Sequence, residues 1–246
     1  MRLTAYEPVR IEGVDGVSYE RDSGSLISDN ETSDGLAYVV QSEQPQPTAT
    51  GLQSARNSRL PVDVRDRYLA LPDVDPAIAA ETNRILAGKV TPYDKAKALQ
   101  DHFRSGQFTY NLDARPGHDE RALRRFLLVT KEGYCEQFSG AYAVMARIAG
   151  LPARVAVGFT PGTLDPATGR YVVRGVNAHA WPEVYLEGFG WVAFEPTPGR
   201  GMPGAEAYTG VPEQQGRPDN PGSATTVPPT TPTAPRAGGP RTTRPP

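Results

Sequence analysis

The chain has 246 residues, of which 26 are basic, 28 are acidic and one is a cysteine, and its formal net charge is −2. This near-neutral balance excludes binding of nucleic acid through bulk positive charge. The single cysteine excludes a disulfide within the chain and a cysteine-rich zinc module. No apolar run reaches the roughly 18 residues that a membrane-spanning helix needs. Glycine and proline contribute 25 residues each, so we expect part of the chain to be unstructured.

The first half of the chain is expected to form a small β-rich leader followed by helices. Residues 1–60 are polar and rich in turns, and residues 35–41 have the β-branched and aromatic content of a strand. Asp75 and Thr91 each stand directly before a proline, which is typical of an N-cap followed by the first residue of a helix. Apolar residues at helical spacing follow both signals, and a third helix is predicted near residue 122.

Residues 133–200 combine one helix with several strands. Apolar residues from Phe138 to Ile148 recur at helical spacing, and Gly150 and Pro152 are expected to end that helix. Strands are predicted over residues 153–159, 171–176, 178–186 and 191–195. A helix that is followed by an antiparallel sheet indicates an α+β fold.

The C-terminal region differs in composition from the rest. Residues 201–246 hold 11 prolines and 7 glycines, and no Leu, Ile, Phe or Trp. Such a segment cannot bury enough apolar area to offset an ordering entropy of about 1–2 kcal/mol per residue. We therefore expect a disordered linker whose removal from residue 203 leaves the melting temperature nearly unchanged. Because a linker normally leads to a further segment, the chain is expected to be a piece of a longer protein.

Cys135 stands at the predicted start of the helix in residues 133–200. The free N–H groups and the dipole of a helix N-terminus favour a thiolate and can stabilise an oxyanion. Gly133, two residues earlier, allows a close approach of the backbone. A nucleophile is therefore one interpretation of Cys135, and a small buried hydrophobic residue is the other.

A thiol nucleophile needs a base, which is usually a histidine, and the chain has three histidines. His102 falls on a predicted helix, where a solvated face explains it, and His118 falls in a polar loop at the surface. His179 lies within a predicted strand between two alanines, whose small side chains leave room for the imidazole to meet another group. His179 is therefore the candidate base, and a hydrogen-bonded core histidine is the alternative.

The base is commonly oriented by a carboxylate on its other ring nitrogen. Glu195 closes the next predicted strand, and burial of this acid is costly unless it is paired. Pairing with His179 across adjacent antiparallel strands satisfies that requirement. Glu183 is the rival, but four residues of strand place it about 13 Å from His179. Glu195 is therefore the preferred orienting group, and an acid on the surface at a strand end is the alternative.

Four blocks of sequence follow one another along the chain: GYCEQF at 133–138, GLPAR at 150–154, HAW at 179–181 and GWVAFEPTP at 190–198. Together they resemble the transglutaminase-like superfamily, and most of all its bacterial membrane-anchored branch. The resemblance covers about residues 90–200 and implies a papain-like core with a Cys–His–Asp triad. By position, Cys135 matches the nucleophile, His179 the base and Glu195 the third member. The superfamily usually has Asp at this last position, so Glu195 is a departure that puts catalytic power in doubt.

The resemblance also implies an organisation and a location. Together with the composition of the two ends, it divides the chain into a leader at 1–60, a transglutaminase-like catalytic domain at 61–200 and a linker at 201–246. It implies an extracytoplasmic domain at the bacterial cell membrane, attached to transmembrane segments in a longer protein, with a protein or peptide substrate. Tyr110 and Trp181 are candidate substrate-binding residues, for which packing in the core is the alternative. No cofactor is expected, and no metal, because residues 165–169 lack the spaced acids of a calcium loop.

Several functions remain open at this point. Acyl transfer to an amine is a transglutaminase reaction, whereas transfer to water is a protease or deamidase reaction. A non-catalytic interaction module with the same fold is a further alternative, supported by Glu195 in place of Asp and opposed by the presence of both Cys135 and His179. A cysteine peptidase of another papain-like family is disfavoured by the blocks around His179 and Trp191.

Overall fold

A three-stranded antiparallel sheet lies at the centre of the protein. The computed structural model describes residues 8–20, 23–28, 35–43 and 45–215. Strand β10 (Ala178–Leu186) pairs on one side with β7 (Ala153–Phe159) and on the other with β11 (Gly190–Ala193). The expected strands over 153–159 and 178–186 are confirmed, and the mixture of helices and strands confirms the α+β prediction.

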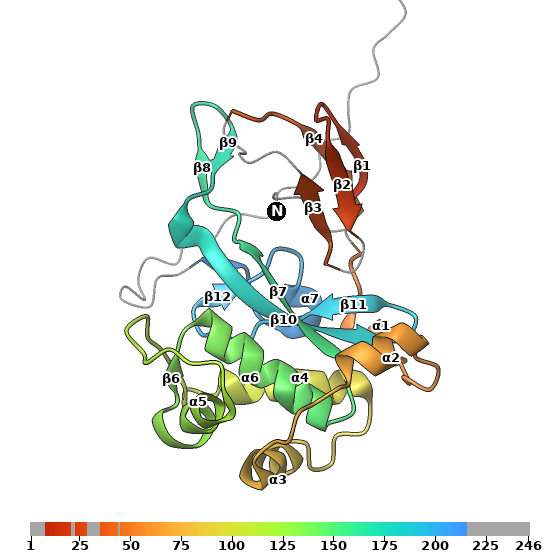
Figure 1. The fold of residues 1–246 in the computed structure, drawn as a ribbon, viewed down its shortest axis with the longest axis vertical. Coiled ribbons are helices and arrows are strands. Elements are labelled where there is room, and N and C mark those ends of the chain that lie inside the picture. Colours follow the sequence, from red (N-terminus) through yellow and green to blue (C-terminus); the bar gives the residue numbers. More distant parts are fainter. Residues whose placement is uncertain (1–7, 21–22, 29–34, 44, 216–246) are drawn as a thin grey trace, which may run out of the picture.

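Helices cover one side of this sheet. Helix α6 (Cys135–Ile148) packs along β10 and β7, and α3 (Pro76–Ile85) and α4 (Pro92–Phe103) pack against α6. Figure 1 shows these helices and α5 (Glu120–Arg125) on one side of the sheet, with strands β1–β4 and the β8–β9 hairpin on the other. The helix that begins at the cysteine therefore packs on an antiparallel sheet, as the sequence predicts.

Local signals account for the ends of these helices. The Asp75 carboxylate accepts a hydrogen bond from the Ala77 N–H at 2.8 Å, and the Thr91 hydroxyl accepts one from the Asp94 N–H at 3.0 Å. Each cap satisfies a free N–H of the first turn and stands before a proline, as expected. Helix α5 continues as a π-helix (Phe126–Thr130), which ends at Lys131.

The other elements are short. They are β1 (Pro8–Glu12), β2 (Val17–Glu20), β3 (Ser25–Ser28), β4 (Val39–Ser42), α1 (Ala49–Leu52), α2 (Val62–Tyr68), β5 (Thr109–Tyr110), β6 (Glu132–Gly133), β8 (Thr163–Asp165), β9 (Arg170–Val172), a 3-10 turn (Gly175–Asn177), β12 (Arg200–Gly201), α7 (Glu206–Thr209) and β13 (Gln214–Gln215). In the leader, β1 pairs with β4 and β2 pairs with β3. The expected leader is thus β-rich, and its strand over 35–41 begins later, at Val39.

The core lies between the helices and the sheet. Four phenylalanine rings from α4, the following loop, the π-helix and α6 contact one another with ring centroids 5.0–6.2 Å apart. These are Phe103, Phe108, Phe126 and Phe138, and all four are buried. Phe194, directly after β11, packs on Tyr142 of α6. This aromatic cluster holds α4 and α6 in fixed positions beside the sheet.

The expected strand over 171–176 is only partly present. Strand β9 ends at Val172, and a 3-10 turn occupies Gly175–Asn177. The Asn177 side-chain oxygen accepts a hydrogen bond from the Arg174 N–H at 2.9 Å. This local bond offers the backbone an alternative to strand pairing, which explains why the strand stops.

The boundary at residue 201 needs correction. Residues 201–215 are not a disordered linker, because they form β12, α7 and β13 and bury Ala205, Tyr208 and Val211. Three apolar side chains suffice here because Tyr208 also offers its carbonyl to the Tyr93 hydroxyl at 2.5 Å. The remainder of the expected linker, residues 216–246, lies outside the described residues.

Candidate active site

The loop before α6 places Cys135 at the first position of the helix. Strand β6 pairs with β5 in a parallel register that sets Gly133 opposite Tyr110, and the Asn111 N–H donates to the Gly133 carbonyl at 2.7 Å. A Cβ atom at Gly133 would lie 2.5 Å from the Gln137 Oε1. Gln137 in turn accepts the Tyr134 N–H at 3.1 Å. A side chain at 133 would therefore displace the Gln137 amide from this bond and press on the Phe126 ring, 2.9 Å from the same Cβ position.

The sheet leaves an open edge where the cysteine lies. Hydrogen bonds between Tyr185 and Pro152, and between Thr160 and Asn177, show that odd-numbered residues of β10 bond toward β7. Even-numbered residues therefore direct their N–H and C=O groups toward β11. Strand β11 ends at Ala193, opposite Glu183. The last hydrogen bond on this side of β10 runs from the N–H of the next residue, Phe194, to the Pro182 carbonyl at 2.9 Å.

Beyond that point, β10 has no strand partner on this side among the described residues. The backbone N–H of Ala180 is directed to the open edge, and it hydrogen-bonds the Cys135 sulfur. A second backbone N–H, from Glu136 in the first turn of α6, also hydrogen-bonds this sulfur. The end of β11 therefore creates the space in which the start of α6 meets β10.

His179 and Glu195 form a buried pair beside this edge. The His179 Nε2 lies 2.7 Å from the Glu195 Oε2, and the two residues are only 3% and 1% exposed. The second carboxylate oxygen of Glu195, Oε1, accepts the Thr197 N–H at 2.9 Å. Because Nε2 is taken by Glu195, Nδ1 is the ring nitrogen that remains for the Cys135 thiol. It is buried and makes no hydrogen bond to the described residues, while the nearby thiol contributes to the raised pKa of the ring.

The charges of these groups support one another. Burial alone would raise the pKa of the Cys135 thiol, but the hydrogen bond and charge of His179 and the two backbone N–H groups lower this pKa below its ordinary value. Burial opposes the charged imidazole, yet Cys135 and Glu195 together raise the pKa of His179 to about 9. The arrangement therefore shifts both groups toward a thiolate–imidazolium pair.

Glu183, the rival acid, has a different partner. Its carboxylate lies 2.7 Å from the Arg154 Nε, and it is 1% exposed. The Arg154 guanidinium stacks over the Trp191 ring at 4.3 Å. Glu183 is thus a buried member of an ion pair, and Glu195 is the acid that reaches His179.

The two candidate substrate-binding residues lie beside His179 and beside the loop that leads to Cys135, respectively. The Trp181 ring stacks beside the His179 ring, with centroids 6.1 Å apart and an angle of 27° between planes. A Cβ atom at Gly158 would lie 2.9 Å from the Trp181 ring, so the glycine leaves space for it. Tyr110 is buried, and its backbone pairs with Gly133, two residues before the cysteine. Both positions adjoin the candidate site, and their roles remain predictions.

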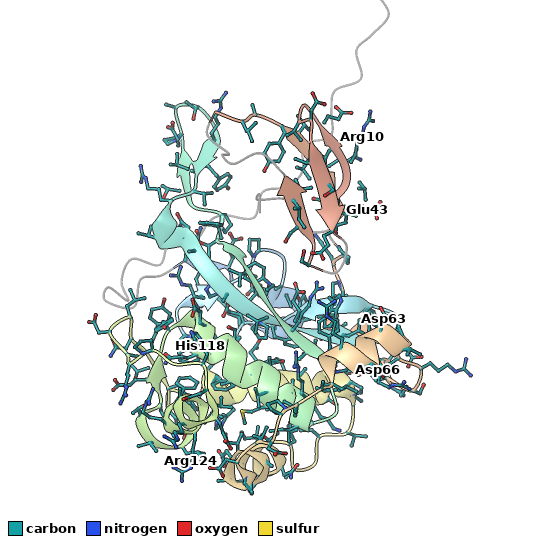
Figure 2. All side chains as sticks on the ribbon, in the orientation of Figure 1. Arg10, Glu43, Asp63, Asp66, His118 and Arg124 are labelled. Atoms are coloured by element: carbon teal, nitrogen blue, oxygen red, sulfur yellow. The ribbon has the colours of Figure 1, made fainter. Side chains whose placement is uncertain are left out.

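The other two histidines lie outside the site. His102 is not on a solvated face as the sequence analysis expects: its ring packs edge-on against Phe103 and Phe108, and its side chain is 8% exposed. His118 is exposed and lies 3.8 Å from Glu136. Figure 2 shows His118 beside α6 and Arg124 at the α3 side of the helical layer.

Two contacts to Glu195 were missed by the sequence analysis. Gln100 of α4 and Arg104, the C-cap of α4, both hydrogen-bond its backbone. Interactions with backbone groups leave no pattern in the sequence, so no signal there could have found them. Within the described residues, no cluster of three or more His, Cys, Asp or Glu could hold a metal ion. None of the described helices is long and apolar enough to cross a membrane.

Comparison with known proteins identifies the domain. The family model described as the transglutaminase-like superfamily matches residues 79–196, the span that contains Cys135, His179 and Glu195. The chain therefore carries a transglutaminase-like domain.

Related proteins support this assignment. The chain is 43% identical over 145 residues to "Uncharacterized protein YebA" of Bacillus subtilis, which covers 54% of this chain and 19% of that protein. It is 33% identical over 146 residues to "Protein-glutamine gamma-glutamyltransferase" of Pseudomonas aeruginosa, which covers 59% of this chain and 22% of that protein. The chain thus spans about a fifth of the length of these two relatives.

A solved structure shares the fold. The periplasmic domain of TgpA from Pseudomonas aeruginosa superimposes with a TM-score of 0.62 and 26% identity, over 84% of this chain and 70% of that one. The same domain bound to ethylmercury gives a TM-score of 0.61 and 28% identity, over 78% and 68% of the two chains. The transglutaminase-like fold expected from the sequence is thereby confirmed.

Proposed function

We propose that this domain catalyses cysteine-dependent acyl transfer from carboxamides of proteins or peptides, through a thioester intermediate. The observation that carries the proposal is the buried 2.7 Å pair of His179 and Glu195 beside Cys135 at the start of α6. A buried carboxylate, an imidazole and a thiol in series are the parts that thiol activation requires. In this proposal Cys135 is the nucleophile, His179 the general acid and base, and Glu195 the residue that orients His179.

The first half of the reaction follows from these roles. The Cys135 thiolate attacks the carboxamide carbon, so that an S–C bond forms and the carbonyl becomes an oxyanion. The first-turn N–H groups of α6 face that region and stabilise negative charge there. His179 then donates its Nδ1 proton to the nitrogen of the carboxamide, the C–N bond breaks and ammonia leaves. The products are a thioester on Cys135 and a neutral His179.

The second half returns the enzyme to its starting state. A primary amine attacks the thioester while His179 removes a proton from it, an amide forms, and the C–S bond breaks to restore the thiolate. Water in place of the amine gives a carboxylic acid. The relative from Pseudomonas aeruginosa is named a protein-glutamine gamma-glutamyltransferase, which favours the amine and a glutamine donor for this chain. In this proposal Trp181 and Tyr110 contact the substrate beside the thiol.

The replacement of Asp by Glu is compatible with activity. The additional methylene of Glu195 still brings its Oε2 to 2.7 Å from the His179 Nε2, and the Thr197 N–H holds the other oxygen. A non-catalytic module has no need of this buried charged arrangement, whose desolvation costs free energy. The geometry therefore supports the enzyme over the interaction module.

We also propose that the domain acts outside the cytoplasm, at the cell membrane. The likeness to the periplasmic domain of TgpA supports this location, and so does the greater length of the relatives, which leaves room for membrane segments in a longer protein. A membrane-impermeant maleimide applied to intact cells should label the wild-type protein and label the Cys135→Ala variant less. Equal labelling of the two, or labelling only after lysis, would contradict the location.

An acyl-transfer assay tests the function. A blocked glutaminyl-glycine peptide and denatured casein serve as donors, with a fluorescent primary amine as acceptor. We expect ammonia release and incorporation of the amine, and neither with Cys135→Ala, whose circular dichroism should match the wild type. Ammonia release without incorporation would make the domain a deamidase, and peptide cleavage would make it a protease. Equal turnover by Cys135→Ala would refute the mechanism.

A further inference from the structure

Helix α4 holds the backbone of Glu195 at both of its polar groups. The Oε1 of Gln100, a fully buried residue, accepts the Glu195 N–H at 3.1 Å. One helical turn later, the Nη1 of Arg104 donates to the Glu195 carbonyl at 3.3 Å. Residues four apart lie on the same face of a helix. Gln100 and Arg104, at the C-terminal end of α4, therefore bind the N–H and the carbonyl of Glu195 from the same side.

The same two side chains also bind residues 200–215, which we call the C-terminal segment. The Gln100 Nε2 donates to the Thr209 carbonyl at 2.9 Å, and the Arg104 Nη1 donates to the Arg200 carbonyl at 3.0 Å. Arg104 further donates to the Thr197 carbonyl at 2.5 Å. Thr197 is the residue whose N–H holds the Glu195 carboxylate. Backbone and carboxylate of Glu195 are therefore fixed by one connected set of hydrogen bonds.

This arrangement is costly if its purpose is stability alone. Taking an amide and a guanidinium out of water carries a desolvation penalty, and burial lowers the pKa of Arg104 below its ordinary value. Apolar side chains in the same volume would often stabilise as well or better. The polar set instead specifies the position of one segment, since each hydrogen bond has a defined length and direction.

We propose that Gln100 and Arg104 are positioning residues that set the Glu195 carboxylate against His179 and make the C-terminal segment 200–215 part of the support of the site. The inference rests on the proposed function and assigns the support of its orienting acid. A displacement of Glu195 by about 1 Å would break the 2.7 Å bond to His179, and such displacements cost about a hundredfold in rate.

The test uses the reactivity of the Cys135 thiol, which needs no substrate. The rate of alkylation by iodoacetamide is measured against pH for the wild type, Gln100→Met and Arg104→Met. We expect the apparent pKa of the thiol to rise by about one unit in both variants, because His179 loses the fixed partner that keeps it charged. In the acyl-transfer assay we expect kcat to fall about tenfold to a hundredfold, with KM changed less.

Tyr93→Phe is the matched control. The Tyr93 hydroxyl joins α4 to the same C-terminal segment through the Tyr208 carbonyl, but it makes no hydrogen bond to Glu195 or His179. Its loss should lower the melting temperature and leave the thiol pKa unchanged. Arg104→Lys gives a second variant in case the methionine variants do not fold. It retains the charge at the end of α4, but its shorter side chain does not place a nitrogen where the Arg104 Nη1 meets the three carbonyls, so we expect a smaller rise of the thiol pKa.

The outcomes separate this inference from the proposed function. A depressed thiol pKa in the wild type that none of the folded α4 variants changes would overturn the positioning role and leave the proposed function standing. A rise in Tyr93→Phe as large as in Gln100→Met would also overturn it, because general loosening of the segment would then be the cause. An ordinary thiol pKa in the wild type would refute the proposed function itself.

Discussion

The leader and the C-terminal segment flank the domain, and the structure treats them differently. In the part of the leader before residue 44, described over residues 8–20, 23–28 and 35–43, Leu26 alone is buried. Strands β1–β4 pair with one another and have few described contacts with other elements, and Figure 2 shows Arg10 and Glu43 on this outlying part. The C-terminal segment 200–215 buries Tyr208, Thr209 and Val211, among others, against the domain.

A segment can be held by burial of its apolar side chains or by hydrogen bonds to its backbone, and amino-acid composition reports only the first. The C-terminal segment is held by backbone carbonyls at 200, 208 and 209, which accept hydrogen bonds from Arg104, Tyr93 and Gln100. Every residue carries a carbonyl, so no composition reveals this attachment. The leader has a similar supply of carbonyls, but the described hydrogen bonds of these three side chains go to residues 195–209 instead.

The largest effect is expected from truncation of the C-terminal segment. A chain that ends at residue 202 loses the burial of Tyr208 and Val211, each worth about 1.5–3 kcal/mol, together with the hydrogen bonds to α4. We expect a marked drop in the melting temperature and a raised thiol pKa of Cys135. A chain that ends at residue 215 should match the full chain. Equal melting temperatures for the two truncated chains would restore the view of residues 201–215 as a linker.

Substitution of Glu195 tests the role of the residue that the C-terminal segment helps to hold in place. Glu195→Gln keeps the volume but removes the charge that favours protonated His179, and we expect kcat to fall about a thousandfold or more. Glu195→Asp restores the charge and should be active, though weaker than the wild type, because its shorter chain reaches less far. Steady-state rates in the acyl-transfer assay measure both effects, and equal rates for Glu195→Gln and the wild type would remove Glu195 from the triad.

The pH dependence of stability tests the same pair without substrate. The pKa of His179 is raised from 6.5 to about 9 in the folded protein. Its contribution to the free energy of unfolding is therefore fully present below pH 6.5 and is lost as the pH rises through about 9. Denaturant unfolding should show a larger gap between wild type and Glu195→Gln at pH 6 than at pH 9.5. A gap that grows with pH would contradict the raised pKa.

The smallest effect is expected from removal of the leader. A chain that begins at residue 45 loses few described contacts with the domain, so we expect a shift of a few degrees in the melting temperature and an unchanged thiol pKa. Thermal unfolding followed by circular dichroism provides the measurement. A loss as large as that caused by truncation at residue 202 would remove the distinction between the two regions.

Local signals explain what the sequence predicts well. Asp75 and Thr91 cap their helices as expected, because a cap and the helix that it starts are neighbours in the chain. The proximity of His179 and Glu195 could also be predicted, since the pairing of adjacent strands over a short loop brings such residues together. Gln100 and Arg104 were not accessible, because their partners are backbone atoms about 90 or more residues away.

The measurement that tests the account most directly is the pH dependence of iodoacetamide alkylation of Cys135, with His179→Ala as the comparison. The account predicts a thiol pKa well below the ordinary value of about 8.5 in the wild type, and a higher pKa when His179 is removed. An ordinary or raised pKa in both proteins would contradict it. Cys135 would then be a structural cysteine, and the domain an interaction module with a transglutaminase-like fold.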